Sequence, residues 1–300
     1  MKRFKAIACV LCVAMLAGIF AGCSKTTKIT TEKFDAACDK LGFDQYDPDD
    51  DDAPDMDALE DGFYCVVDED YIEDNEDSLD STLQDIGLDD VFEAEDIKSF
   101  AFAAKCTGLD GFEDITDVDD IADLEVDGAF ALQMSLNDDK CAEDFMDYVE
   151  DMLDNVDISA KDLTAKEFYT SKNEGYFRFH VDLAKFGALI LENDDIMDMF
   201  DEYDIDSDDF EEAIGALTGD IAVSIEISGS EIFIIAGISI NSKTETLDSF
   251  CKSFGAVSNP KSVPMNEKVC EEIVDNLSDN AGDLFYYIYM AQLYSSSYSG

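Results

Sequence analysis

Apolar residues recur at helical spacing in three segments, and each apolar stripe lies opposite a row of acids. In Glu143–Val156 the apolar positions are three or four residues apart, with carboxylates between them. Ile196–Tyr203 and Phe210–Leu217 repeat this spacing. Because an α-helix completes a turn every 3.6 residues, the pattern predicts three amphipathic helices, each with one apolar and one acidic face.

Other segments alternate apolar and polar residues, as strands with one buried face do. Ile221–Ile227 and Ile232–Ile240 flank the turn residues Ser228-Gly229-Ser230, which predicts a hairpin. Further strands are predicted at Lys166–Ser171, Tyr176–Leu183, Ser99–Thr107 and Gly128–Leu136. Since helices and antiparallel strands are interspersed without a long βαβ rhythm, the pattern favours the α+β class, with antiparallel sheet packed against amphipathic acidic helices.

A weak internal repeat links the beginning and the end of this pattern. Thr31–Gly42 and Thr244–Gly255 place apolar groups at i, i+3, i+4 and i+7, include a cysteine in that stripe, and stop at a glycine suited to a helix C-cap. A duplicated domain and a coincidence of helix patterning both explain the repeat. Duplication predicts two related α+β domains, residues 32–157 and 158–300.

The N-terminal residues form a predicted export signal. Met1–Lys5 carries three cations, and the following stretch, Ala6–Ala21, contains no charge. A basic start before such a stretch is typical of a secretory signal, because a membrane-spanning helix needs about 20 apolar residues.

Phe20-Ala21-Gly22-Cys23 resembles the lipobox of bacterial lipoproteins, in which small residues precede a cysteine that receives a diacylglyceryl group and becomes residue one. Phe20 stands where leucine most often opens that motif, and the resemblance covers residues 1–23 only. It implies a signal peptide over 1–22 and a lipidated Cys23, followed by a tether up to residue 31. Two or more acyl chains would anchor the protein to the outer face of the cytoplasmic membrane, at the cell surface. An ordinary cleaved signal is the alternative.

The charge of the mature chain is extreme. Residues 1–22 hold three of the 19 Lys and Arg and none of the 72 Asp and Glu, so their removal leaves 16 cations, 72 acids and a net charge of −56. With 46% apolar residues, the chain is nevertheless not a disordered acidic tail. Nucleic acid is excluded as a partner, because its phosphates would be repelled. Cationic proteins or peptides and divalent metals stay open as partners.

Six cysteines remain after the signal and the anchor are set aside. An even number in an exported chain suggests disulfides, and neighbourhood in the sequence favours the pairs Cys38–Cys65, Cys106–Cys141 and Cys251–Cys270. Buried free thiols are the alternative, because cysteine packs as a small apolar residue. Zinc binding is less favoured, since the mature chain has no C-x-x-C spacing.

Calcium is the metal that an acidic chain would bind. Asp123–Gly128 matches the first half of an EF-hand loop, but position 12 of that motif falls on Met134, and the segment is better interpreted as entering a strand. Asp44–Asp61 has ten acids in eighteen residues. We expect a solvated loop there, with a weak Ca²⁺ site as the alternative; its ligands would be Asp49, Asp50, Asp51, Asp52, Asp55 and Asp57.

Catalytic patterns are weak. Alternation places the single histidine, His180, with Arg178 and Asp182 on the outward face of a strand, which favours a surface ion pair over catalysis. Gly237–Asn241 falls one residue short of a G-x-S-x-G elbow around Ser239, so a serine hydrolase is disfavoured. The tyrosine-rich segment Asp283–Tyr294 is expected to pack in the core, with an exposed binding edge as the alternative.

These observations together predict a membrane-anchored, extracytoplasmic, non-enzymatic protein that binds a cationic partner or is displayed at the surface. No cofactor is expected. The alternatives are a low-affinity Ca²⁺-binding surface protein and a hydrolase whose site the sequence conceals.

Overall fold

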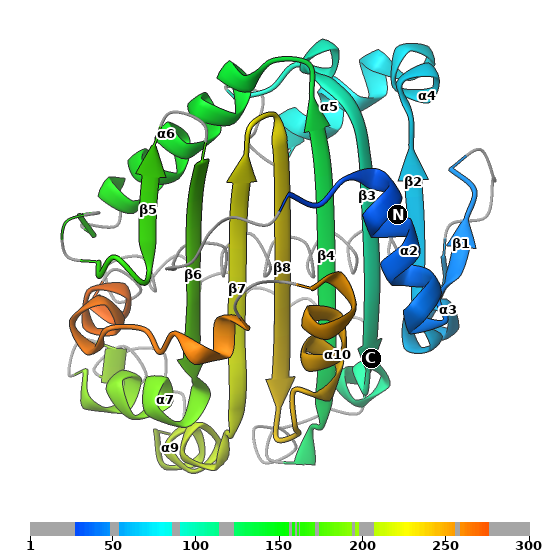
Figure 1. The fold of residues 1–300 in the computed structure, drawn as a ribbon. Coiled ribbons are helices and arrows are strands. Elements are labelled where there is room, and N and C mark those ends of the chain that lie inside the picture. Colours follow the sequence, from blue (N-terminus) through cyan, green and yellow to red (C-terminus); the bar gives the residue numbers. More distant parts are fainter. Residues whose placement is uncertain are drawn as a thin grey trace, which may run out of the picture.

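A computed structural model describes residues 28–48, 54–85, 91–113, 123–155, 158–159, 161, 163–171, 174–193, 196–197, 207–255 and 259–275. One eight-stranded sheet runs through this part of the chain (Figure 1). Its strands are β1 (Asp44–Tyr46), β2 (Phe63–Val67), β3 (Ile97–Thr107), β4 (Val126–Leu136), β5 (Phe168–Ser171), β6 (Glu174–Asp182), β7 (Gly219–Ser228) and β8 (Glu231–Ile240).

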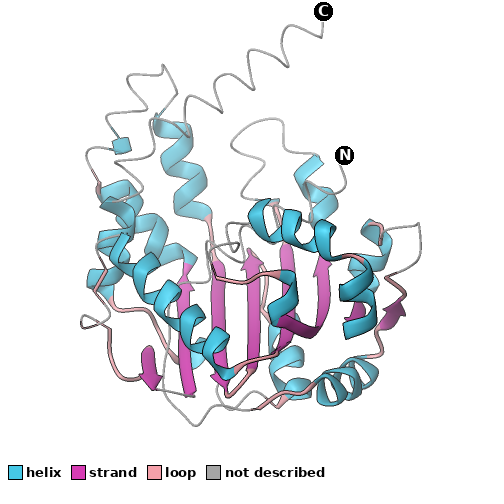
Figure 2. Ribbon diagram, turned by 90° about the horizontal axis from the view of Figure 1, so that it is seen from above, coloured by secondary structure: helices cyan, strands magenta, loops and turns pink. Residues whose placement is uncertain are grey.

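The helices lie on both faces of the sheet (Figure 2). They are α2 (Thr31–Leu41), α3 (Met56–Asp61), α4 (Glu69–Asp74), α5 (Glu76–Asp85), α6 (Asp139–Asn155), α7 (Leu183–Glu192), α9 (Ser207–Ala216) and α10 (Glu245–Phe254), with residues 267–275 also helical. They are accompanied by the 3₁₀ turns η1 (Ala94–Asp96), η2 (Leu109–Glu113) and η4 (Pro260–Ser262). The α+β class predicted from the sequence is confirmed.

The strand order is β1-β2-β3-β4-β8-β7-β6-β5. All neighbours are antiparallel except β1 and β2, so the sheet is mixed rather than wholly antiparallel as predicted. The predicted hairpin of β7 and β8 is confirmed, with Gly229 in the left-handed region at φ 65°. Residues 32–157 supply β1 to β4 and residues 158–300 supply β5 to β8, and a ladder from Val126↔Ile240 to Ser135↔Glu231 joins the two sets.

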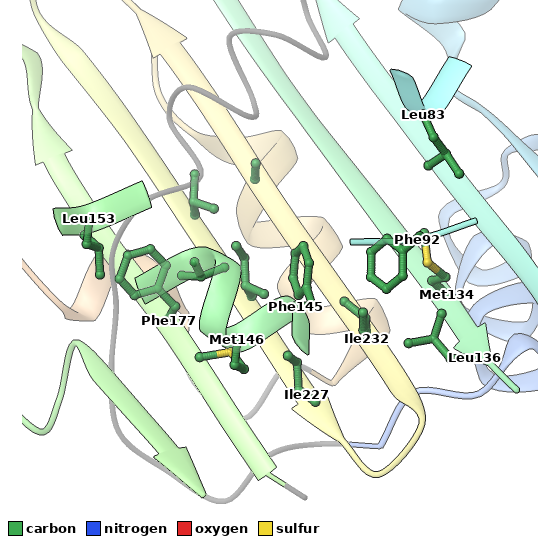
Figure 3. Close-up of a cluster of buried hydrophobic side chains, with 14 of the residues drawn as sticks. Leu83, Phe92, Met134, Leu136, Phe145, Met146, Leu153, Phe177, Ile227 and Ile232 are labelled. Carbon is green, nitrogen blue, oxygen red and sulfur yellow. The ribbon is translucent and has the colours of Figure 1, made fainter. Parts of the chain in front are cut away.

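The larger core lies between one face of the sheet and α6, with helices α4 and α5 beside it (Figure 3). Phe145, Met146 and Leu153 of α6 pack against Phe177 and Ile227 of the sheet, as the amphipathic pattern predicts. The same face buries Leu83 of α5 and Phe92, so this core extends beneath the acidic helices near β2.

The second core lies on the opposite face, beneath α2 and α10, the two helices of the internal repeat. These helices are side by side (Figure 1), and the ring centroids of Phe34 and Phe254 are 4.8 Å apart. Gly42 and Gly255 end them at φ 75° and 66°, which confirms both predicted C-caps. However, α6 and α10, which each follow a central strand, pack on opposite faces of the sheet.

Candidate functional site

The most distinctive surface is an acidic edge on the β1 side of the sheet. Residues 41–97 contain 24 Asp and Glu and no Lys, Arg or His. The structure places α3 before β2 and α4 and α5 after it. Helices α3 and α4 lie on the side of the sheet that β1 ends, and α5 continues from α4 towards β4 (Figure 1). We define the acidic edge as the Asp and Glu side chains of α3, α4 and α5.

Local structure explains why this highly charged segment folds. Asp55 and Asp68 cap α3 and α4, because their Oδ1 atoms accept from the N–H groups of Ala58 (3.0 Å) and Tyr71 (3.1 Å). Acids in the first turn of each helix also interact favourably with its positive N-terminal dipole. The prediction of a loop over Asp44–Asp61 is therefore wrong for β1 and α3, which both lie inside it.

The carboxylates of α4 point outward. Glu69, Asp70, Glu73 and Asp74 of α4 are all exposed, while Ile72 of the same helix is buried. Within the described part of the chain, no cation lies within ion-pair distance of these four side chains. Their charge is thus available to a partner.

The acidic edge does not assemble a metal site in the residues that the structure describes, where no group of three or more His, Cys, Asp or Glu converges on a common point. Asp55 is occupied as a helix cap and Asp57 is exposed on α3, while Asp49, Asp50, Asp51 and Asp52 lie outside the described residues. The EF-hand-like segment enters β4, as expected. There Asp127 accepts from the N–H (3.0 Å) and hydroxyl (2.8 Å) of Thr246 at the start of α10.

A second group of charges lies on β6 and β7 and is buried. Arg178 is the sole arginine outside residues 1–22, and its side chain is 0% exposed. Its guanidinium donates to Glu226, which is 2% exposed, and its Nε donates to Ser224 Oγ at 3.0 Å. The guanidinium carbon also lies 4.9 Å from the ring centroid of Tyr176.

This burial corrects the prediction that Arg178 faces solvent. The alternation was assigned correctly, because Phe177 and Phe179 point into the larger core and Arg178 points to the other face. That face is not open, however, since η4 packs against β6 and β7. Because both charged groups are buried and paired with each other, we interpret this ion pair as structural.

His180 belongs to a neighbouring, half-buried set. Its Nε2 lies 2.5 Å from Asp220 Oδ1, and Lys261 Nζ lies 3.7 Å from Asp220 Oδ2. Lys261 also donates to Thr244. His180 is therefore linked to a carboxylate by a hydrogen bond, although the acid comes from β7 and is not neighbouring Asp182, which caps α7.

The serine considered as a nucleophile is not placed for catalysis. Ser239 lies within β8, is fully buried, and accepts from the N–H of Asp220 at 3.0 Å. In a Ser-His-Asp triad the carboxylate binds Nδ1 so that Nε2 faces the serine, whereas Nε2 of His180 faces Asp220 here. This geometry gives no support to a serine hydrolase centred on Ser239.

The cysteines whose side chains are described are free thiols: Cys38, Cys65, Cys106, Cys251 and Cys270. The predicted pair Cys38–Cys65 is absent because the two residues lie in cores on opposite faces of the sheet. The pair Cys251–Cys270 is also absent, and the side chain of Cys141 lies outside the described residues. Burial raises the pKa of the Cys38, Cys106 and Cys251 thiols to about 12, so they stay protonated and unreactive at neutral pH.

A polar depression of about 450 Å³ lies at the end of the sheet where α2 begins. Thr31, Lys98, Asn137, Ser230 and Glu231 are among its lining residues. The carboxylate of Glu231 accepts from Ser135 (2.5 Å) and from the buried Gln133 (2.9 Å), and Lys28 Nζ lies 3.4 Å from it.

Several predictions concern residues outside the described ranges, namely the signal segment, Cys23 and the tyrosine-rich segment Asp283–Tyr294. In the part of the chain that the structure describes, no helix is both long enough and apolar enough to cross a bilayer. Comparison with protein-family models, with curated proteins and with solved structures found no match to this chain.

Proposed function

We propose that this protein is a lipid-anchored, extracytoplasmic binding or display protein, without enzymatic activity, that recruits a cationic partner through the acidic edge. The observation that supports this proposal most is that the acidic side chains lie at the surface. Among the described side chains, Glu167 and Glu226 are the only fully buried acids. The fold therefore keeps its negative charge at the surface and concentrates it where 57 consecutive residues include no cation.

Such a surface has two physical effects. It raises the local concentration of a cationic protein or peptide and increases its association rate, and it keeps copies of the protein apart by repulsion. The open strand β1 is short and carries Asp44, which also hinders edge-to-edge pairing between copies. Both effects suit a protein that is crowded on a membrane.

The partner proposal is tested with an oligolysine peptide as the probe. One variant neutralises α4 by Glu69→Gln, Asp70→Asn, Glu73→Gln and Asp74→Asn. The control removes the same number of exposed charges elsewhere, by Glu211→Gln, Glu212→Gln, Glu267→Gln and Glu271→Gln. Isothermal titration calorimetry at low salt measures the dissociation constant of each protein.

We expect the α4 variant to bind the peptide roughly tenfold more weakly than wild type, since each exposed ion pair contributes about 0.2–1 kcal/mol. The control variant should stay close to wild type. Equal losses in both variants would show that only net charge matters, and the acidic edge would then have no special role.

The anchor proposal is tested by Cys23→Ser in cells that make lipoproteins. Wild type should partition with membranes and into detergent phase, and its mature N-terminal peptide should carry the mass of a diacylglyceryl group on Cys23. The variant should lose both properties. Retention of the Cys23→Ser protein in membranes would contradict the anchor.

The two-domain interpretation also stays a proposal. The strand order gives each half of the chain four neighbouring strands, and the repeat helices α2 and α10 pack side by side, which agrees with duplication. The opposite placement of α6 and α10 argues against a simple repeat of strand and helix.

A further inference from the structure

The two ends of the sheet differ in their relation to the N-terminal tether. We call the end of the sheet that carries Lys28, the first described residue, the near end, and the opposite end the far end. The near end also carries the start of α2, Lys98, Asn137 and the β7–β8 turn, several of which line the polar depression. At the far end, Asn241 donates to the carbonyl of Leu124 (3.1 Å), and Ser242 donates to that of Val126.

The first described residue is fixed to the near end. Lys28 Nζ lies 3.4 Å from Glu231, and Lys33 Nζ donates to the carbonyl of Lys28 at 2.6 Å. Thr31, at the start of α2, has its hydroxyl 3.1 Å from Gln133 Oε1 and 3.4 Å from Ser99 Oγ. Figure 1 shows the described chain beginning in front of the sheet, in the part nearer the end at which β7 and β8 join.

Chain length then limits how far this end can lie from the lipid. Cys23 and Lys28 are five residues apart, so even a fully extended backbone separates them by no more than about 18 Å. The far end is about 30 Å further along the strands, because β4 runs from Val126, opposite Ile240, to Ser135, opposite Glu231. The contact of Lys28 with Glu231 is on β8, which lies between β4 and β7 near the middle of the sheet and not at one side.

We propose that the near end of the sheet faces the bilayer and that the far end is presented to the exterior. This inference rests on the proposed lipid anchor at Cys23. Since Phe63 of β2 pairs with Ala104 and Val67 pairs with Phe100, β2 runs from the far end to the near end. The acidic edge is thus divided, with α3 presented away from the membrane and α4 beside it.

The orientation is tested by energy transfer from a dye on the protein to acceptor-labelled lipids. Full-length lipidated protein is placed on phosphatidylcholine vesicles, which carry no net charge and so do not repel the acids. Matched substitutions Lys98→Cys and Lys243→Cys place the dye at the near and far ends, and both lysines are exposed. The protein without either substitution measures labelling of the native thiols.

We expect transfer to be several-fold larger from position 98 than from position 243. A flexible Gly-Ser insertion between Lys25 and Lys28 should reduce this difference, because a longer tether lets the body rotate. Equal transfer from both positions, or larger transfer from 243, in vesicle-bound protein would overturn the orientation alone. Failure of the wild-type protein to bind vesicles would overturn the anchor, and with it this inference.

Discussion

Removal of the Glu226 carboxylate should destabilise the protein more than any loss of a surface charge. In Glu226→Gln the shape of the side chain is kept, but the guanidinium of Arg178, which is 0% exposed, loses its buried counter-charge. Breaking a buried ion pair from one side costs about 3–5 kcal/mol, because the other charge stays desolvated. The free energy of unfolding of a typical domain is about 5–15 kcal/mol, so this change removes a large part of it.

Urea unfolding followed by far-UV circular dichroism measures the loss in free energy of unfolding. Lys268→Gln is the control, because it breaks the ion pair with Glu272 in which the lysine is 58% exposed, and it should cost less than about 1 kcal/mol. In the double variant Arg178→Met/Glu226→Leu neither charge of this pair remains, so stability should recover to within about 1–2 kcal/mol of wild type. A loss below about 1 kcal/mol in Glu226→Gln, or a double variant less stable than the single one, would refute this reasoning.

Three other predictions concern stability. The pKa of the Cys38 thiol is about 9 in the unfolded chain and is raised to about 12 in the fold, so the unfolded state binds fewer protons above pH 9 and stability falls as pH rises. Urea titrations from pH 8 to 10 should therefore show wild type losing about 1.4 kcal/mol more unfolding free energy than Cys38→Ala. Parallel pH profiles of the two proteins would contradict this. Gly237→Ala should cost about 1–3 kcal/mol by thermal unfolding, because its Cβ would lie 2.7 Å from Cβ of Leu247. Gly215→Ala, which has open space around it, should be neutral or stabilising. Equal effects of the two substitutions would refute the close packing of α10 on β8. Asp68→Ala should cost about 1 kcal/mol in the same assay through loss of the α4 cap, and no change would show that the cap is not formed.

Alternation and helical periodicity predicted most of the sheet and its principal covering helix. Strands β3, β4, β6, β7 and β8 and helix α6 lie where the patterns place them, because each has one clearly apolar face. Strand β2 was missed since it is buried on both faces and reads Phe-Tyr-Cys-Val-Val, without alternation. Helices α4 and α5 were missed because they are short and contribute few buried residues, Ile72 and Leu83, among many acids.

The buried charges could not be predicted from the sequence for a different reason. Alternation tells which residues share a face of a strand, but not whether a distant segment covers that face. In this protein η4, some eighty residues later, packs against β6 and β7, the strands that hold Arg178 and Glu226. A sequence signal did exist, since the one histidine and the only arginine outside residues 1–22 fall two residues apart on a single strand.

We propose that the acidic surface acts by general electrostatics toward cationic partners and does not hold a particular ion. This proposal is tested by thermal unfolding of residues 24–300 in calcium, magnesium and sodium salts at matched ionic strength. Screening relieves self-repulsion, so we expect a similar rise in Tm for calcium and magnesium, without saturation. A saturating rise specific to calcium would mean that formed sites bind the native state, and the protein would then be a calcium-binding protein.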